Sequence, residues 1–203
     1  LDTEGLGDIE KGDDNNDNWI FALSVLLSST LVYNWQSSIQ ADALGKLHYV
    51  TNLTDLIKSK SSRDKEGDEE EEFIKIFPNF VWVLRDFTLT LEKDGRPITA
   101  DQYLTDALKT KPGFKKEVIE YNLPRKCIEK YFREKKCFVL KRPVDKDELF
   151  CKLEILRDDE LQPDFLREVQ KFCEYIFTSA KPKSFEGKNL NGSMICQLLD
   201  NFV

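Results

Sequence analysis

Residues that could bind a magnesium nucleotide open the chain, in the run Asp2-Thr3-Glu4-Gly5. A carboxylate in such a run can orient a water molecule on Mg²⁺, because this ion prefers oxygen ligands and keeps most of its waters. The glycine lets a backbone N–H approach a phosphate, where a Cβ would intrude. The spacing therefore predicts a site for magnesium and a γ-phosphate. Taken alone, however, an Asp-x-x-Gly run more often marks an ordinary strand-to-loop turn.

A second pair of chemically suitable residues, Arg85 and Asp86, directly follows the apolar run 80–84. The carboxylate of Asp86 can accept hydrogen bonds from N1–H and the 2-amino group of guanine, a pair that adenine does not offer. The guanidinium of Arg85 can stack on the plane of the base. A surface ion pair at a strand end is the simpler interpretation of these two residues alone. The order of the two motifs along the chain makes a guanine-nucleotide site a stronger prediction than either motif does.

Both motifs require a sheet whose strands end near each other. Short apolar runs at 80–84 and 136–140 are typical of parallel strands buried on both faces, and the β-branched and aromatic run 28–34 predicts a further strand. Amphipathic patterns predict helices over 22–27, 39–60, 99–108, 123–132, 147–157 and 163–178, followed by a last helix near the end of the chain. This alternation predicts an α/β fold with a mainly parallel sheet flanked by helices.

Local signals predict where several of these helices begin. Ser, Thr, Asp and Asn side chains commonly accept a hydrogen bond from a backbone N–H of the first helical turn. Proline is favoured at the first helical position. The expected start signals are Asp17 or Asn18 for the first helix, the capping box Thr99 with Gln102, Pro124 for the helix 123–132, and Ser193 for the last helix.

Composition narrows the class of protein. The net charge of −7 argues against a general binder of nucleic acid or anionic membranes. One His, and five Cys without a C-x-x-C pair or disulfide-like spacing, leave little for a zinc site and favour a reducing, cytoplasmic location. The apolar stretch 19–33 is interrupted by serines and is too short to span a bilayer, so we expect no direct membrane anchor. The acidic run 63–72 predicts a solvated loop, with a docking tail for a basic partner as the alternative.

Longer stretches around both motifs, and others downstream, resemble guanylate-binding proteins, the interferon-induced large GTPases of the dynamin superfamily. The resemblance covers essentially the whole chain. Atlastins also read guanine with Arg-Asp, but they lack the Glu-Gly-Leu-Gly-Asp run at 4–8. The stretches that carry the resemblance are 2–12, 19–23, 80–87, 122–125, 135–139 and 142–144.

The resemblance implies GTP and Mg²⁺ as cofactors and gives a role to each residue of the opening motif. Asp2 would hold Mg²⁺ through a water molecule, and Gly5 would contact the γ-phosphate. Glu4, the catalytic candidate, would lie in the network around the attacking water. Thr3 and Leu6 would complete the nucleotide-binding loop.

At the base, the resemblance implies that Asp86 selects guanine with Arg85 beside it. The segment from Arg142 to Glu148 would be the guanine cap, with Arg142 at the nucleotide, and would also form part of a homo- or heterodimer interface with relatives. The implied activity is GTP binding and hydrolysis within a protein of interferon-induced innate immune defence. Full-length family members can associate with vesicle, Golgi or pathogen membranes.

Three features depart from the family pattern. Val83 stands where the guanine motif usually has Thr, an isosteric change, and the cap is unusually acidic. The chain also contains no Gly-x-x-x-x-Gly-Lys-Ser/Thr run. The family keeps this phosphate-binding loop, its arginine finger and switch I upstream of the opening motif. Residues 1–203 are therefore expected to be a P-loop GTPase-like, dynamin-type domain that is incomplete at the N-terminus, without middle or effector helical domains.

Because the phosphate-binding loop and arginine finger provide most of the catalysis in such enzymes, we expect these 203 residues alone to be catalytically incompetent. We also expect them to bind GTP and Mg²⁺ weakly. The alternative function is a non-catalytic interaction module that associates with full-length relatives.

Overall fold

The computed structural model describes residues 2–3, 14–47, 74–185 and 188–202. Its centre is a parallel sheet of β1 (Thr30–Gln36), β2 (Asn79–Arg85) and β5 (Lys135–Val139), in the order β1-β2-β5. In the register of the sheet, Trp82 of β2 lies beside Tyr33 of β1 and Cys137 of β5. The three predicted strands are thus confirmed, although β1 begins and ends two residues later than predicted.

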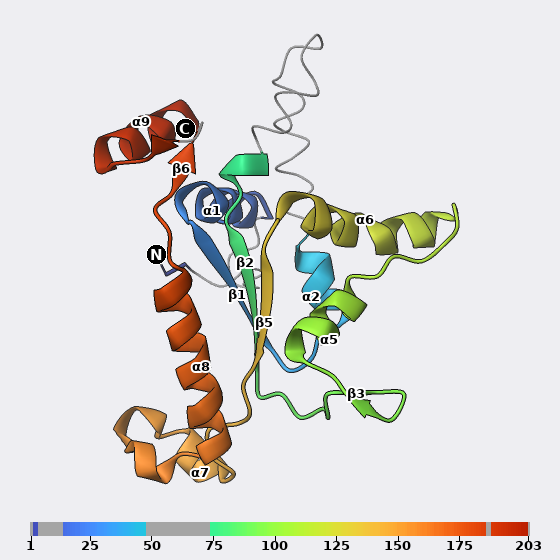
Figure 1. Cartoon of the computed structure of the whole chain (residues 1–203), viewed down its shortest axis with the longest axis vertical. Helices are drawn as coiled ribbons and strands as arrows, with labels where there is room; N and C mark the ends of the chain where they lie inside the picture. Colours follow the sequence, from blue (N-terminus) through green and yellow to red (C-terminus); the bar gives the residue numbers. More distant parts are fainter. Residues whose placement is uncertain (1, 4–13, 48–73, 186–187, 203) are drawn as a thin grey trace.

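Helices and two short strand pairs surround this sheet (Figure 1). The strand pairs are antiparallel: β3 (Glu92–Lys93) with β4 (Arg96–Pro97), and β6 (Ser184–Phe185) with β7 (Lys188–Asn189). The helical elements are α1 (Asp14–Leu27), α2 (Ala41–Lys46), α5 (Ala100–Ala107), α6 (Lys116–Tyr131), α7 (Asp147–Phe150), the 3₁₀ turns η1 (Leu153–Ile155) and η2 (Asp158–Glu160), α8 (Pro163–Ser179) and α9 (Gly192–Phe202). The predicted α/β fold with a mainly parallel, helix-flanked sheet is confirmed.

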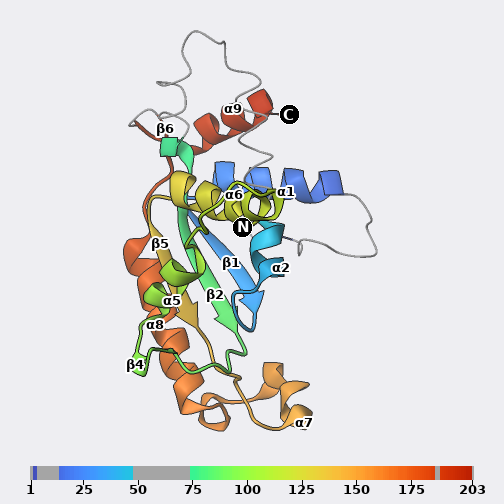
Figure 2. The same ribbon diagram turned by 90° about the vertical axis from the view of Figure 1, so that its right-hand side faces the viewer.

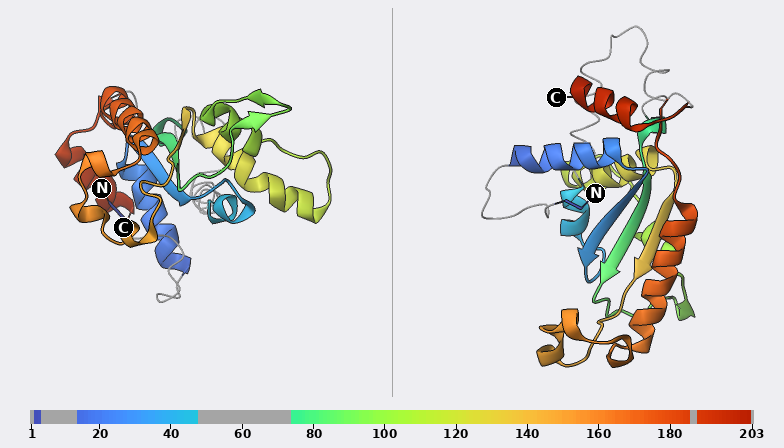
Figure 3. Two further views of the ribbon diagram at one scale, coloured as in Figure 1. Left: turned by 90° about the horizontal axis from the view of Figure 1, so that it is seen from below. Right: turned by 90° about the vertical axis from the view of Figure 1, so that its left-hand side faces the viewer.

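The central strand β2 is buried on both faces, as its continuous apolar run requires. β1 is less buried than its predicted character suggested: Tyr33 is buried, whereas Val32, Asn34 and Gln36 are exposed. On one face, Phe80, Trp82 and Leu84 pack in a large aromatic core with side chains of α1, α2, α5 and α6. On the other face, Val81 and Val83 pack with β5 residues against α8. Figures 1 and 3 show α8 alone beside this second face. β2 is therefore held rigidly between two layers, which fixes the position of the residues at its end.

Helix starts were predicted with mixed success. The capping box is confirmed, because the Gln102 N–H donates to Thr99 Oγ1 at 3.1 Å and the Thr99 N–H donates to Gln102 Oε1 at 2.8 Å. The prediction for α9 was wrong, since the Met194 N–H donates to Asn191 Oδ1 and Ser193 lies inside the helix. For α1 the prediction was also wrong: Asp17 and Asn18 lie within a helix that begins at Asp14.

The predicted helix 123–132 is α6, but it begins seven residues earlier, so Pro124 lies inside it. A proline there removes one backbone donor of the helix. Side chains stabilise this part of the helix instead. Asn122 pairs through both amide atoms with the N–H and C=O of Lys111, at 2.8 Å each, and Arg125 donates to the carbonyls of Ala107 and Tyr121.

The predicted helix 147–157 was wrong beyond its first turn. α7 ends at Phe150 and the 3₁₀ turns η1 and η2 follow. Ile155 remains 76% exposed, so this segment lacks the apolar packing that stabilises short helices.

The predicted helix 163–178 is confirmed as α8. Of the predicted helix 39–60, α2 is observed; 48–60, like the acidic run 63–72, lies outside the described residues. No helix within the described ranges is both long and apolar enough to cross a bilayer.

Thiol accessibility gives a direct check of the packing. Cys127 and Cys137 are buried, whereas Cys151, Cys173 and Cys196 are exposed. Burial raises the pKa of the Cys137 thiol to about 12, so it stays protonated and unreactive at pH 8, because the thiolate is the nucleophile. We expect a disulfide reagent at pH 8 to modify the three exposed thiols of the folded chain, and all five cysteines in denaturant. Mass-spectrometric detection of fast Cys137 modification in the folded chain would contradict the fold.

Candidate functional site

Asp86 lies at the carboxyl end of the central strand, the first residue after β2. Its backbone adopts φ 53°, the left-handed conformation that Asp tolerates better than most residues. The next residue, Phe87, donates its N–H to the Leu140 carbonyl at 2.9 Å, and the Leu140 N–H donates to the Leu84 carbonyl at 2.8 Å. The chain on both sides of Asp86 is thus fixed to the segment that follows β5.

The neighbouring strand β1 holds the same turn from the other side. Its last residue, Gln36, lies opposite Arg85, and Ser37 turns away with φ 65°. The Ser37 N–H donates to the Arg85 carbonyl at 2.6 Å, and Gln36 Nε2 donates to Asp86 Oδ2 at 3.2 Å. Two adjacent strands therefore end in left-handed turns that are hydrogen-bonded to each other, with the Asp86 carboxylate between them.

The side chains at this turn are accessible to a ligand. Arg85 is exposed and Asp86 is half-buried. Val83, the residue that replaces the usual Thr, is 5% exposed and packs with Phe138 on the α8 face. The replacement is therefore in the core and not at the turn. Such a turn can present an ionised carboxylate to a planar ligand with two adjacent N–H donors, beside an arginine able to stack on it.

The expected cap segment lies at the same end of the sheet. Figure 2 shows β1, β2 and β5 all pointing toward the α7 region. Arg142 follows β5, forms an ion pair with Asp147, and places its guanidinium carbon 4.7 Å from the centre of the Phe150 ring. Val144 is buried, and the Gln162 N–H donates to the Pro143 carbonyl at 2.8 Å. The segment 142–148 is therefore an ordered structure beside the strand ends, with its acidic side chains exposed.

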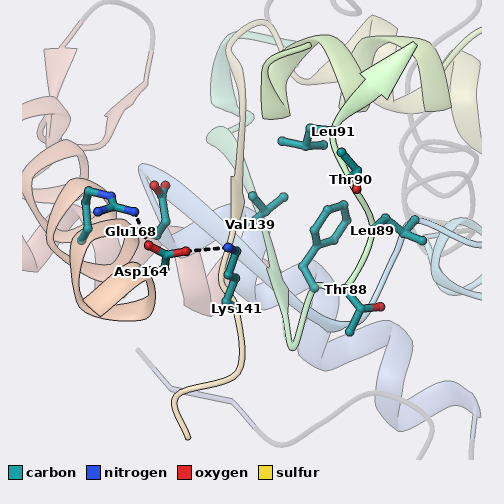
Figure 4. Close-up of a pocket in the computed structure, with 10 residues that line it drawn as sticks. Thr88, Leu89, Thr90, Leu91, Val139, Lys141, Asp164 and Glu168 are labelled. Carbon is teal, nitrogen blue, oxygen red and sulfur yellow. Dashed lines mark hydrogen bonds and ion pairs between the residues drawn. The ribbon is translucent and has the colours of Figure 1, made fainter. Parts of the chain in front are cut away.

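A pocket of about 430 Å³ opens on the α8 side of the same region (Figure 4). The loop 87–91 forms one wall, and Asp164, Arg167 and Glu168 of α8 form the other. Lys141 also lines the pocket, and its ammonium forms an ion pair with Asp164 at 2.5 Å. Lys141 and Arg167 hold the pKa of the Asp164 carboxyl below its usual value. Arg85, Asp86 and Arg142 do not line this pocket, so it is distinct from the turn at Asp86.

The opening motif is placed only in part. Asp2 and Thr3 are exposed, and Glu4, Gly5 and Leu6 lie outside the described residues. The roles of these five residues therefore stay predictions. The structure brings Arg85 and Asp86 to the same end of the sheet as the segment that begins at Arg142 (Figure 2).

Sequence reasoning missed Gln36. It lies two residues beyond the predicted end of its strand, and glutamine belongs to no nucleotide motif. Its position beside Arg85 depends on the pairing and register of β1 with β2, which the sequence pattern does not supply.

The mainly parallel, helix-flanked sheet is consistent with an α/β domain of the P-loop GTPase-like class. Comparison with known proteins narrows this class. The family model "Guanylate-binding protein, N-terminal domain" matches residues 1–185. The chain belongs to the guanylate-binding protein family.

Individual relatives are similar over the whole chain. Guanylate-binding protein 1 of Chlorocebus aethiops is 53% identical over 205 residues, and guanylate-binding protein 1 of Homo sapiens is 52% identical over 207 residues. Guanylate-binding protein 7 of Mus musculus is 50% identical over 205 residues. All of this chain is covered in each comparison, against 35%, 35% and 32% of the relatives. The chain thus spans about a third of the length of these relatives.

Proposed function

We propose that this chain supplies the guanine-reading part of a domain that binds and hydrolyses GTP, in a protein of interferon-induced innate immune defence. The observation that carries this proposal is the position of Asp86. Its carboxylate stands between two hydrogen-bonded strand ends, next to an exposed arginine and close to an ordered cap segment. Membership of the guanylate-binding protein family supports the same ligand.

Guanine selection would follow from the chemistry of this carboxylate. N1–H and the 2-amino group of guanine both donate, and an ionised carboxylate has two oxygens that only accept. Adenine has an unprotonated N1 and no 2-amino group, so it would leave the carboxylate desolvated and unpaired, which is costly. Arg85 would stack on the base, and the segment 142–148 would cover it.

At the phosphate end, Asp2 would bind Mg²⁺ through a water molecule, with Glu4 near the attacking water and Gly5 at the γ-phosphate. Mg²⁺ in nucleotide sites is commonly held by one or two carboxylates together with phosphates and water. An exposed Asp2 fits this mode of binding. The part of the chain that the structure describes holds no group of three His, Cys, Asp or Glu side chains that could form an all-protein metal site.

The 203 residues contain no Gly-x-x-x-x-Gly-Lys-Ser/Thr run. We therefore propose that they hydrolyse no GTP by themselves and bind it weakly. We also propose a cytoplasmic location, because five Cys without disulfide-like spacing favour a reducing compartment. The second candidate function is a non-catalytic module that pairs with full-length relatives through the cap face. The observation that favours it is the ordered cap segment 142–148 in a sequence without the phosphate-binding run.

One chimera tests the first function. Residues 2–203 replace the matching segment of human guanylate-binding protein 1, which restores a phosphate-binding loop around this chain. We expect Mg²⁺-dependent hydrolysis of GTP and not of ATP by the chimera, and no hydrolysis by the 203-residue chain. A chimera that unfolds cooperatively but neither binds nor hydrolyses GTP would contradict the proposal. Capture of human guanylate-binding protein 1 by the isolated chain, with no nucleotide binding, would favour the interaction module.

A further inference from the structure

Gln36, at the end of β1, donates a side-chain hydrogen bond to the carboxylate of Asp86, which follows the neighbouring strand β2. The two residues are 50 apart in sequence, and the parallel pairing of β1 with β2 brings them together. Gln36 is the last residue of the ladder, opposite Arg85. The hydrogen bond from the Ser37 N–H to the Arg85 carbonyl fixes the backbone next to it. The contact is therefore built into the register of the sheet.

A neutral donor suits this position. Among the described residues, the side-chain partner of the Asp86 carboxylate is the neutral amide of Gln36 and not a basic group. Two carboxylate oxygens offer about four acceptor sites. Gln36 occupies one site on Oδ2, which leaves acceptor capacity on both oxygens. The amide can therefore hold the carboxylate in one rotamer without removing its ability to accept two hydrogen bonds.

We propose that Gln36 is a positioning residue for guanine recognition, whose side-chain amide holds the Asp86 carboxylate ready to accept from N1–H and the 2-amino group. This inference rests on the proposed function of Asp86. It assigns no contact between Gln36 and the nucleotide. Because Gln36 acts through Asp86, its effect must disappear when the Asp86 carboxylate is absent.

A double-mutant cycle in the chimera tests this coupling, with GDP as the titrated ligand. Gln36→Met keeps the length of the side chain and removes its donor. We expect the Kd for GDP to rise about 2- to 10-fold, the effect of losing one such hydrogen bond. In an Asp86→Ala background the same substitution should leave the Kd unchanged. Gln36→Glu, which places a second carboxylate beside Asp86, should raise the Kd for GDP further than Gln36→Met does.

Gln40→Met is the matched control, because Gln40 is an exposed glutamine nearby that donates to Ser38 Oγ and not to Asp86. We expect it to leave the Kd for GDP unchanged. An unchanged Kd for Gln36→Met, or an equal rise in both backgrounds, would overturn the role of Gln36. If Asp86→Ala itself leaves the Kd for GDP unchanged, the proposed function fails instead. If Gln36→Met does not fold, the same cycle with Gln36→Glu decides the question.

Discussion

Asp86→Asn is expected to weaken the binding of GDP to the chimera about 100-fold. The substitution removes the charge and replaces one acceptor with a donor, which faces a donor of guanine. Hydrogen bonds to charged groups contribute about 1.5–3 kcal/mol each, and a factor of 10 corresponds to about 1.4 kcal/mol. Loss of one such bond and repulsion at the second position together account for the expected change. Isothermal titration calorimetry with GDP measures it.

Asp94→Asn is a suitable control for this measurement. Asp94 is an exposed aspartate that also has a positive φ, 51°, in the turn between β3 and β4. Asp94→Asn therefore makes the same chemical change in left-handed backbone outside the proposed site, and it controls for a general effect of the change on the folding of the chimera. We expect Asp94→Asn to leave the Kd for GDP unchanged, and equal losses in the two variants would contradict base recognition by Asp86.

Lys183→Met is expected to lower the free energy of unfolding of the chain by about 2–3 kcal/mol. Lys183 precedes β6, and its ammonium donates to the carbonyls of Val25 at 3.0 Å and Ser28 at 2.8 Å, and to that of Ile76. Val25 and Ser28 lie at the carboxyl end of α1, where carbonyls lack partners within the helix and a positive charge is favourable. Without the ammonium these acceptors would be left unpaired, and each costs about 1–3 kcal/mol if it stays buried.

The environment of Lys183 explains why its loss should matter more than that of a surface lysine. Its ammonium donates to three backbone carbonyls, and these contacts must outweigh a desolvation cost, because burial lowers the pKa of the ammonium to about 8. Figure 1 shows the segment between α8 and β6 passing α1, so this side chain fastens the C-terminal part of the chain to the amino end of the sheet. Lys181→Met is the control, because Lys181 is 71% exposed and 3.9 Å from Glu134. We expect a change of no more than about 0.5 kcal/mol for it.

Urea unfolding, followed by tryptophan fluorescence, to which the buried Trp82 contributes, compares these two variants. Amide hydrogen exchange adds a local measurement, since Lys183→Met should increase exchange in β6 and β7 more than in β2. Equal stability of the two lysine variants would show that the three carbonyl contacts contribute little.

Parts of the fold that depend on local pattern could be predicted from the sequence. The continuous apolar run 80–84 predicted β2, because a strand buried on both faces needs apolar residues at every position. The Thr99 capping box was predictable because its two partners are three residues apart. α8 was predictable because its apolar face is continuous and packs on the sheet.

Features that depend on distant partners could not be predicted in this way. In the sequence, Lys183 is one of several lysines in a polar segment. Its role depends on acceptors that are distant in sequence, one of them 158 residues away. Asn122 of α6 pairs with the backbone of Lys111, which lies outside the helix, so helix propensities could not predict this contact. At the candidate site, the motif was enough to single out Asp86. Finding Gln36 beside it required the register between β1 and β2.

Recognition of the guanine base by Asp86 can be tested directly. The measurement is the affinity of the chimera for xanthosine diphosphate compared with GDP. Xanthine keeps N1–H but has an oxygen in place of the 2-amino group, so it complements an amide and repels a carboxylate. We predict that Asp86→Asn reverses the preference of the chimera, from GDP over xanthosine diphosphate to xanthosine diphosphate over GDP. A preference for GDP that is unchanged by Asp86→Asn would contradict the assignment of the site.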